Sequence, residues 1–407
     1  MNVIFLTLVR ISDIEERGIY HDLMRKFRNE GHQVYIVTAA ERRLEQETSL
    51  VDSHGVKILN VKTLNVQKTN IVEKGIGTLL IERQFESAIK KYLGNISFDL
   101  ITYSTPPITF TNVVKYLKRK NPNAISYLQL KDIFPQNAVD IGLFGEKSVF
   151  NWYFRKKEKA LYKTSDYIGC MSPANVEFVL RHNPEVTAER VEVAPNSVEL
   201  RNEDAATDDP GQMKAASYYI KKKFGLPLDK PIFIYGGNLG KPQGIDYLIK
   251  CLDANKHRTD CYFVVVGSGT HYGLISDWYK DNKDSNVKLM QSLPKTDYDL
   301  LVKSCDVGLI FLDHRFTIPN YPSRLLSYLE NKMPVLCVTD VNTDIGSIAE
   351  ANGYGFWCES VKPEDFTALV DKMLKSDRKA KGEKGYQFLK ENYLVEHTYN
   401  AIMKHFD

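Results

Sequence analysis

The sequence predicts an α/β protein of two domains, each built on a mainly parallel sheet with helices on its faces. The chain has 407 residues, which is more than one hydrophobic core usually supports. Short segments rich in Val and Ile alternate with helical patterns along both halves of the chain. A polar, acidic segment with a Pro-Gly pair, residues 200–216, lies between the halves and predicts a linker or a mobile surface loop.

The first half begins with a strand, a helix and a strand. Asn2–Val9 and Gln33–Ala39 are strand-like, and between them apolar residues recur every four positions until Gly31 ends the helix. These strands are apolar on both faces, as a buried parallel sheet requires. Further strands are predicted at Val56–Val61, Phe98–Ser104, Ala124–Leu130, Tyr167–Met171 and Val191–Ala194. Residues 1–199 are therefore assigned to an N-terminal domain.

The second half repeats the alternation and predicts a second Rossmann-like sheet over residues 200–380. Its strands are predicted at Pro231–Tyr235, Tyr262–Gly267, Val287–Gln291, Val307–Leu312, Pro334–Val338 and Gly355–Cys358. Residues 381–407 are helical in pattern and do not return to the sheet, so we expect them to pack back toward the N-terminal domain. Ligands of open α/β sheets bind at the carboxyl ends of strands, which predicts an active site in a cleft where the two sheets face each other.

Composition excludes several classes of protein. The chain is 43% apolar and 26% charged, as in ordinary globular proteins, and no apolar run approaches the length of a membrane span. Its start, Asn2–Val9, lacks the features of a signal peptide, so we expect a cytoplasmic protein with six reduced cysteines. A net charge of +3 is too small to indicate a nucleic-acid partner.

Positive charge is concentrated in the first half. Residues 1–200 hold 27 Lys and Arg against 23 Asp and Glu, whereas the remainder holds 27 against 28. Two runs, Lys115–Lys120 and Arg155–Lys159, mix basic with aromatic residues, and Phe150–Phe154 precedes the second. Such segments are suited to an anionic membrane surface, which would place the protein at the inner face of the membrane. Solvated helix faces with aromatic residues turned into the core explain them equally well.

A glycine-rich turn is the most specific local signal. Tyr235–Ile249 reads as a strand, a turn with four glycines and a helix. Glycines let backbone N–H groups approach a diphosphate, the helix N-terminus favours an anion, and Lys241 adds a cation. A turn that merely ends a strand has the same appearance.

A second element strengthens the diphosphate interpretation. Thr317–Glu330 reads as a loop followed by a helix, with Arg324 in the first turn of that helix. A cation there is unfavourable for the helix dipole unless an anion is bound, and a guanidinium suits bidentate contact with phosphate. An ordinary surface arginine is the alternative.

The segments Tyr235–Ile245, Pro322–Leu329 and Leu130–Gln136 together resemble glycosyltransferase family four. The likeness is greatest to bacterial members of the fucosaminyltransferase type, which build capsule and O-antigen repeat units. It covers nearly the whole chain and implies the GT-B fold, a UDP-sugar donor, retaining transfer, and neither metal nor cofactor. It also implies an N-acetylated deoxyhexose such as N-acetyl-fucosamine as the sugar, and an undecaprenyl-diphosphate-linked saccharide as the acceptor.

The chain departs from the family pattern at the donor positions. Asn238 and Gln243 stand where many relatives carry an arginine and a lysine, and Pro319 and Ser327 stand where they carry two glutamates. Lys241 and Arg324 are the candidates to replace the missing cations, and Ser327 or Glu330 to contact the ribose. The donor site that the resemblance implies consists of Gly237, Asn238, Lys241, Gln243, Gly267, Leu293, Ser323, Arg324, Ser327 and Glu330.

The acceptor side is expected in the first half. Asp132 follows a strand in a position where relatives show an Asp before an aromatic-Pro pair, and it is the candidate for contact with the transferred sugar or acceptor hydroxyl; a residue that caps a turn is the alternative. Lys131 and Gln136 are lesser candidates for acceptor contact. Arg10 and Arg17 lie after the first strand, where they are placed either to meet a pyrophosphate or to form a solvated loop.

Other functions fit the sequence less well. No metal-ligand pair or hydrolase motif occurs, and Arg10–Asp13 follows the first strand where a dinucleotide-binding oxidoreductase has G-x-G-x-x-G. A nucleotide-sugar 2-epimerase shares the expected architecture. An inactive sugar-nucleotide-binding module also fits the substituted donor positions.

Overall fold

The computed structural model describes residues 1–65, 71–200 and 210–406. It divides into two compact units, unit 1 with Met1–Glu199 and Val395–Asp407, and unit 2 with Leu200–Leu394. The division after Glu199 falls at the expected boundary. The return to unit 1 begins at Val395 and not at residue 381, because α15 (Arg378–Asn392) packs within unit 2. A Cβ on its Gly382 would lie 1.8 Å from the carbonyl oxygen of Lys332.

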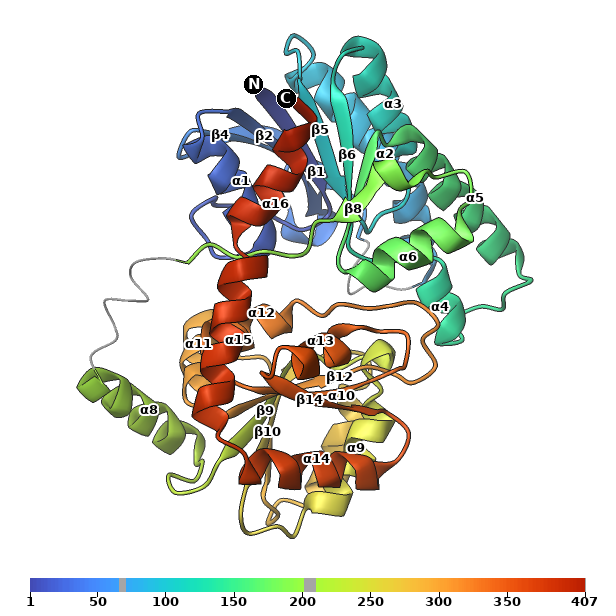
Figure 1. The fold of residues 1–407 in the computed structure, drawn as a ribbon. Helices are drawn as coiled ribbons and strands as arrows, with labels where there is room; N and C mark the ends of the chain where they lie inside the picture. Colours follow the sequence, from blue (N-terminus) through green and yellow to red (C-terminus); the bar gives the residue numbers. More distant parts are fainter. Residues whose placement is uncertain (66–70, 201–209, 407) are drawn as a thin grey trace. The chain divides into compact units, whose positions relative to one another are not determined.

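Unit 1 is built on an eight-stranded sheet in the order β3-β4-β2-β1-β5-β6-β7-β8 (Figure 1). Its strands are β1 (Asn2–Thr7), β2 (Gln33–Glu41), β3 (Ser49–Ser53), β4 (Val56–Thr63), β5 (Leu100–Ser104), β6 (Ile125–Leu130), β7 (Tyr167–Cys170) and β8 (Val191–Val193). All neighbours are parallel except β3 and β4, which form an antiparallel hairpin. The sequence analysis missed β3 because it is an exposed edge strand without an apolar run.

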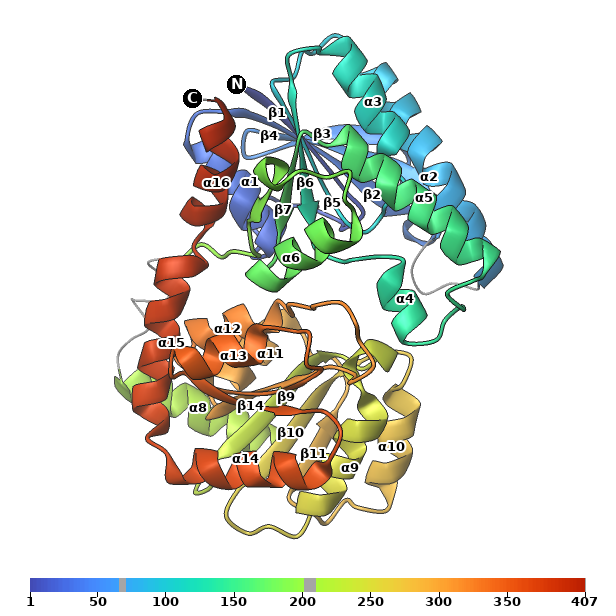
Figure 2. The ribbon, with the colours of Figure 1, turned by 45° about the vertical axis from the view of Figure 1, so that its right-hand side comes forward.

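Helices cover both faces of this sheet. They are α1 (Ile19–Asn29), α2 (Ile71–Tyr92), α3 (Thr111–Lys120), α4 (Gln136–Asp140), α5 (Val149–Thr164), α6 (Pro173–His182) and α16 (Val395–Met403), with 3-10 turns at Arg42–Leu44, Ala188–Arg190 and Lys404–Phe406. Helices α1 and α16 lie together on one face and α2, α3 and α5 on the other (Figure 2). Phe27 of α1 meets Tyr399 of α16 with their ring centroids 4.9 Å apart. Gly31 ends α1 with φ of 84°, as predicted.

Unit 2 has an entirely parallel six-stranded sheet in the order β11-β10-β9-β12-β13-β14. Its strands are β9 (Ile232–Asn238), β10 (Tyr262–Ser268), β11 (Val287–Met290), β12 (Val307–Phe311), β13 (Val335–Thr339) and β14 (Gly355–Glu359). The other helices of the unit are α8 (Pro210–Phe224), α9 (Ile245–Asn255), α10 (Tyr272–Lys280), α11 (Lys295–Lys303), α12 (Arg324–Glu330), α13 (Ile345–Ala351) and α14 (Pro363–Lys375), with a 3-10 turn at Lys241–Gln243.

The predicted fold class of two Rossmann-like sheets is confirmed. Of the expected linker at residues 200–216, residues 210–216 are helical and begin α8, and residues 201–209 lie outside the described part of the chain. All six cysteines are buried free thiols. Among the described residues, no helix combines the length and the apolar character that crossing a membrane requires.

Candidate active site

The glycine-rich turn lies at the carboxyl edge of the sheet of unit 2. Strands β9 and β10 run side by side until Gly237 pairs with Gly267. A Cβ on Gly267 would lie 1.8 Å from the carbonyl oxygen of Gly237, and Gly237 itself has φ of 131°. Both positions therefore require glycine for the two strand ends to approach each other.

This close approach leaves a pocket of about 400 Å³ at the ends of β9, β10 and β11. It is lined by Gly237, Asn238, Val266, Gly267, Ser268, Ser292, Leu293 and Tyr298. Four of the predicted donor residues thus meet in one place, from segments up to 56 positions apart in the sequence, 293 minus 237. The carboxyl edge of a parallel sheet is the usual position of a nucleotide in this class of fold.

Arg324 is the first residue of α12 and stands beside this pocket. Its guanidinium carbon lies 4.4 Å from the centre of the Tyr235 ring, and a Cβ on Gly237 would lie 3.4 Å from its Nη2. The Nη1 atom is buried without a hydrogen-bond partner, and within the described residues no carboxylate forms an ion pair with this side chain. A buried guanidinium nitrogen without a partner is costly, so an anionic ligand is the expected partner.

Gln243 shapes the turn that follows β9. Its Oε1 accepts hydrogen bonds from Asn238 Nδ2 at 2.9 Å and from the backbone N–H of Gly240 at 3.2 Å. Lys241 begins the same 3-10 turn, is partly exposed and is not among the residues that line the pocket. At the two positions where the family pattern has cations, this chain thus has an amide pair, Asn238 and Gln243, that holds the loop.

The remaining predicted donor residues belong to α12. Ser323 is exposed and precedes the helix, Ser327 lies one turn after Arg324, and Glu330 ends the helix. None of the three lines the pocket described above. Their contacts with a ribose or a sugar stay predictions.

Tyr298 of α11 is a pocket residue that sequence analysis missed. Its hydroxyl would lie 2.1 Å from a Cβ on Gly236, so the hydroxyl occupies the space above that glycine. The only sequence signal was a glycine in a strand that is otherwise apolar, and this does not reveal which distant side chain fills the space.

Asp132 follows β6 at the carboxyl edge of the sheet of unit 1. The hydroxyl of Thr105 accepts the backbone N–H groups of Lys131 at 2.9 Å and Asp132 at 3.1 Å, which fixes the loop. Within the described residues the Asp132 carboxylate accepts no hydrogen bond, so Thr105 holds the turn and Asp132 does not cap it. Burial raises the pKa of Asp132 to about 6.

Lys131 and Gln136 point to different surroundings. Lys131 Nζ donates to the carbonyl oxygen of Ala194 at 3.3 Å, and burial lowers the pKa of its ammonium group to about 7. Gln136 begins α4, where its Nε2 donates to Asp140 at 2.8 Å. Lys131 therefore shares the buried loop of Asp132, whereas the amide of Gln136 bonds within its own helix.

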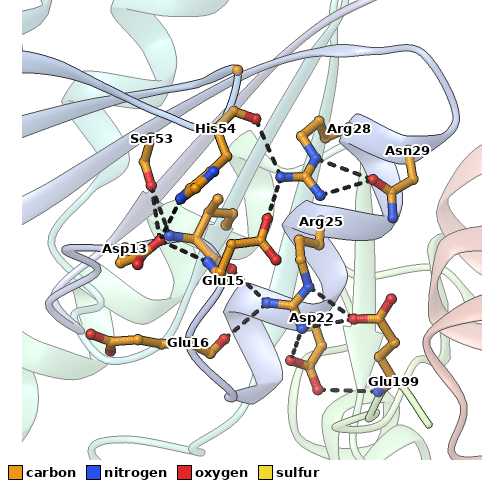
Figure 3. A network of polar contacts seen from close by, with 12 residues as sticks. Asp13, Glu15, Glu16, Asp22, Arg25, Arg28, Asn29, Ser53, His54 and Glu199 are labelled. Carbon is orange, nitrogen blue, oxygen red and sulfur yellow. Dashed lines mark hydrogen bonds and ion pairs between the residues drawn. The ribbon is translucent and has the colours of Figure 1, made fainter. Parts of the chain in front are cut away.

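The loop after β1, residues 10–18, is fixed by Arg25 of α1 (Figure 3). Arg25 donates to the carbonyl oxygens of Ile14 at 2.5 Å and Glu16 at 2.9 Å, and pairs with Asp22 at 2.5 Å and Glu199 at 2.8 Å. Asp22 also accepts the N–H of Gly18, so a carboxylate already occupies the start of α1.

The two arginines predicted for this loop differ in their surroundings. Arg10 is exposed and donates to Gln46 at 3.4 Å, and Arg17 is partly exposed. The Asp22 carboxylate already occupies the N-terminus of α1. Any contact of this loop with a pyrophosphate would therefore have to come from the side chains of Arg10 and Arg17.

Family models match both units. The model described as Glycosyltransferase Family 4 matches residues 19–202, and that described as Glycosyl transferases group 1 matches residues 219–388. Among curated proteins, the probable glycosyltransferase WbjE of Pseudomonas aeruginosa is 20% identical over 65% of this chain and 64% of its own length. The putative colanic acid biosynthesis glycosyl transferase WcaI of Escherichia coli K12 is 26% identical over 46% and 43%. The matches span less than two thirds of the length of these relatives.

Solved structures resemble the whole chain. A sucrose-phosphate synthase from Thermosynechococcus elongatus has a TM-score of 0.74 at 13% identity, covering 100% of this chain and 98% of that one. HepE of Anabaena, solved with UDP-glucose, has a TM-score of 0.67 at 12% identity, covering 100% and 99%. WaaG, a glycosyltransferase of lipopolysaccharide biosynthesis, has a TM-score of 0.65 at 14% identity, covering 99% of both chains. These likenesses identify the fold as GT-B, and together the comparisons favour a transferase over an epimerase.

Proposed function

We propose that this chain is a family four glycosyltransferase that transfers a sugar from a UDP-sugar to a lipid-linked saccharide, and the matches of glycosyltransferase family models to both of its units support this. The unpartnered, buried Nη1 of Arg324 beside the glycine-lined pocket is the observation that carries this proposal. The donor diphosphate would accept from this guanidinium, and the nucleoside would occupy the pocket near Leu293 and Tyr298. The solved relative HepE with UDP-glucose supports uridine as the nucleoside.

Transfer requires that the bond between the anomeric carbon and the diphosphate oxygen break while a bond to the acceptor hydroxyl forms. In the retaining course that we propose, Arg324 stabilises the charge that builds on the leaving diphosphate. The departing phosphate oxygen takes the proton of the acceptor hydroxyl, so no strong protein base is needed. Asp132, with its pKa raised by burial to about 6, orients the transferred sugar or the acceptor hydroxyl.

The identity of the substrates is the finer part of the proposal. We propose an N-acetylated deoxyhexose such as N-acetyl-fucosamine as the sugar and an undecaprenyl-diphosphate-linked saccharide as the acceptor, in capsule or O-antigen synthesis at the cytoplasmic face of the membrane. The names of the relatives, which refer to colanic acid and lipopolysaccharide biosynthesis, support a polysaccharide precursor. The described residues contain no cluster of His, Cys, Asp or Glu suited to a metal, and metal-independent transfer is part of the proposal.

Calorimetric titration with UDP, GDP and UDP-N-acetylhexosamines, in metal-free buffer and then with magnesium, tests the donor site. We expect UDP to bind without metal and Arg324→Ala to weaken it by about 1.5–3 kcal/mol, the value of a hydrogen bond to a charged group. Arg258→Ala is the control, since Arg258 pairs with Asp260 and Asp371 away from the pocket. Equal affinity in Arg324→Ala would remove Arg324 from the site, and isomerisation of the donor without acceptor would replace the transferase by an epimerase.

A further inference from the structure

A second pocket, of about 580 Å³, lies in unit 1 among α2, α3 and α5 and belongs to no part of the proposed transfer site. It is lined by Leu79, Leu80, Glu82, Arg83, Glu86, Asn112, Lys115, Arg119 and Lys157. The three helices lie side by side on one face of the sheet (Figure 2), so residues far apart in sequence form one surface. We call this surface, with the beginning of α5, the basic face.

The cations of this pocket have no internal counter-ions. In the described part of the chain, Arg83, Lys115 and Arg119 form no ion pair or side-chain hydrogen bond, and Lys157 contacts only the ring of Tyr153. The two acids are already engaged in other contacts. Glu82 accepts from Asn112, and Glu86 pairs with Lys90 at 2.6 Å. With four cations against two carboxylates, the lining of the pocket therefore carries a net positive charge.

Some neighbouring basic residues of α3 and α5 do have a counter-ion within the protein. Lys118 of α3 pairs with Asp166, and Arg155 of α5 pairs with Glu158 and donates to the carbonyl oxygen of His182. Lys118 and Arg155, which do not line the pocket, are thus paired, whereas the four cations that line it have no ion pair among the described residues.

Exposed apolar side chains lie on two of the same helices, α2 and α5. Leu79 and Leu80 line the pocket and are exposed, and at the start of α5 Val149, Phe150 and Trp152 are 78%, 66% and 64% exposed. The aromatic residues before Arg155 therefore lie in two different environments. Phe154 is half-buried and packs on Phe134 and Phe144, while Phe150 and Trp152 are exposed. Exposed aliphatic and aromatic groups on the helices that carry these cations fit the boundary of a lipid bilayer.

We propose that the basic face docks on an anionic phospholipid membrane, with a lipid phosphate in the pocket of Arg83, Lys115 and Arg119 and with Val149, Phe150 and Trp152 in the headgroup boundary. A nucleic acid would match the charge but leaves the aliphatic residues without a partner. The inference deepens the proposed function and rests on it for its purpose, since a lipid-linked acceptor lies at a membrane. Vesicle binding needs neither donor nor acceptor, so its failure and a failure of transfer are separate results.

Sedimentation with vesicles tests the charged part. The full chain should bind vesicles of 30% phosphatidylglycerol in phosphatidylcholine, bind pure phosphatidylcholine far less, and be released at 0.5 M salt. The triple variant Arg83→Gln, Lys115→Gln, Arg119→Gln should lose about 100-fold in partition, at roughly fivefold for each charge. Lys283→Gln, Lys375→Gln, Lys379→Gln, three exposed lysines of unit 2, removes the same charge and should change binding little.

Trp152 reports the apolar part. Its fluorescence should shift to the blue when anionic vesicles are added, and the shift should vanish in Trp152→Phe although that variant still binds. A circular-dichroism spectrum and a melting temperature like those of the wild type show that each variant is folded. Wild-type partition in the triple variant, equal loss in the unit 2 control, or tighter binding of single-stranded RNA than of vesicles would each overturn the proposal.

Discussion

Each unit contains an arginine in a helix next to its predicted site, and the two arginines differ in their partners. Arg25 of unit 1 bonds to two carboxylates and two carbonyl oxygens, all within unit 1. Arg324 of unit 2 lies over the ring of Tyr235 and leaves Nη1 buried without a partner. The difference indicates a structural role for Arg25 and a ligand-binding role for Arg324. A guanidinium with counter-ions inside the protein stabilises the fold, whereas one without them is suited to bind an anionic ligand.

The largest expected effect concerns Arg25. Arg25→Met leaves Asp22 buried without its cation, so we expect a loss of about 3–5 kcal/mol in the free energy of unfolding. Urea denaturation followed by circular dichroism measures this loss. Arg28→Met is the control, because the pair of Arg28 with Glu15 is more exposed and is expected to contribute about 1 kcal/mol or less. Equal losses in the two variants would contradict the structural role of Arg25.

Arg324→Ala should weaken UDP binding and change the stability of the fold little, which is the reverse of what we expect for Arg25→Met. The variant removes no ion pair, so the free energy of unfolding should change by about 1 kcal/mol or less. UDP affinity should fall by about 10- to 150-fold, as expected for the loss of a charge-assisted contact. Denaturation and calorimetry on one preparation separate the two quantities, and a large loss of stability with intact UDP binding would reverse the comparison.

Gly267→Ala tests the backbone approach that forms the donor pocket. The added Cβ would overlap the carbonyl oxygen of Gly237, so β9 and β10 must move apart at a cost of about 1–3 kcal/mol, with weaker UDP binding. Gly273→Ala is the matched control in the same unit, because its Cβ would meet nothing within 4 Å and lie in helix α10. We expect this control to be neutral or slightly stabilising in thermal unfolding.

Asp132 should give the smallest effect, one that depends on pH. Because its pKa in the folded state, about 6, exceeds the ordinary 3.8, folding favours the protonated form. The stability that this group contributes is gained as pH falls from about 6 toward 3.8 and is lost as pH rises through 6.

Asp132→Asn removes this dependence. The variant should melt about 2 °C or more above the wild type at pH 8, and the difference should shrink at pH 4.5. Sugar transfer should fall at every pH, because the amide no longer orients the substrate through a carboxylate. A wild-type melting profile across this range would show that Asp132 titrates normally.

Sequence periodicity predicted most of the fold because buried parallel strands are apolar on both faces and their helices are amphipathic. It failed at β3, where the exposed edge strand has no apolar pattern, and at the beginning of α8, where a Pro-Gly pair that follows an acidic segment resembles a loop. Proline in the first turn of a helix is compatible with that helix, so the same residues fit both interpretations.

The residues of the candidate donor pocket were predictable where a short motif carries them. Gly237, Asn238 and Arg324 lie in motifs of a few residues, and the structure brings them to one pocket edge. Gln243 was assigned to the donor although its amide holds the turn, because hydrogen bonds inside a loop are not visible in residue order. Tyr298 was missed because the glycine it covers is 62 positions away, 298 minus 236.

The sequence by itself determined two α/β domains, their boundary at Glu199, and the glycine turn and arginine of the candidate donor site, because each depends on periodicity or on a short motif. The tertiary structure decided which charges are compensated. Arg25 and Arg324 look alike as residues in helices, and so do Arg155 and Arg119. Only folding shows that Arg25 and Arg155 meet carboxylates within the protein while Arg324 and Arg119 do not, since an ion pair depends on distances between side chains that residue order does not give.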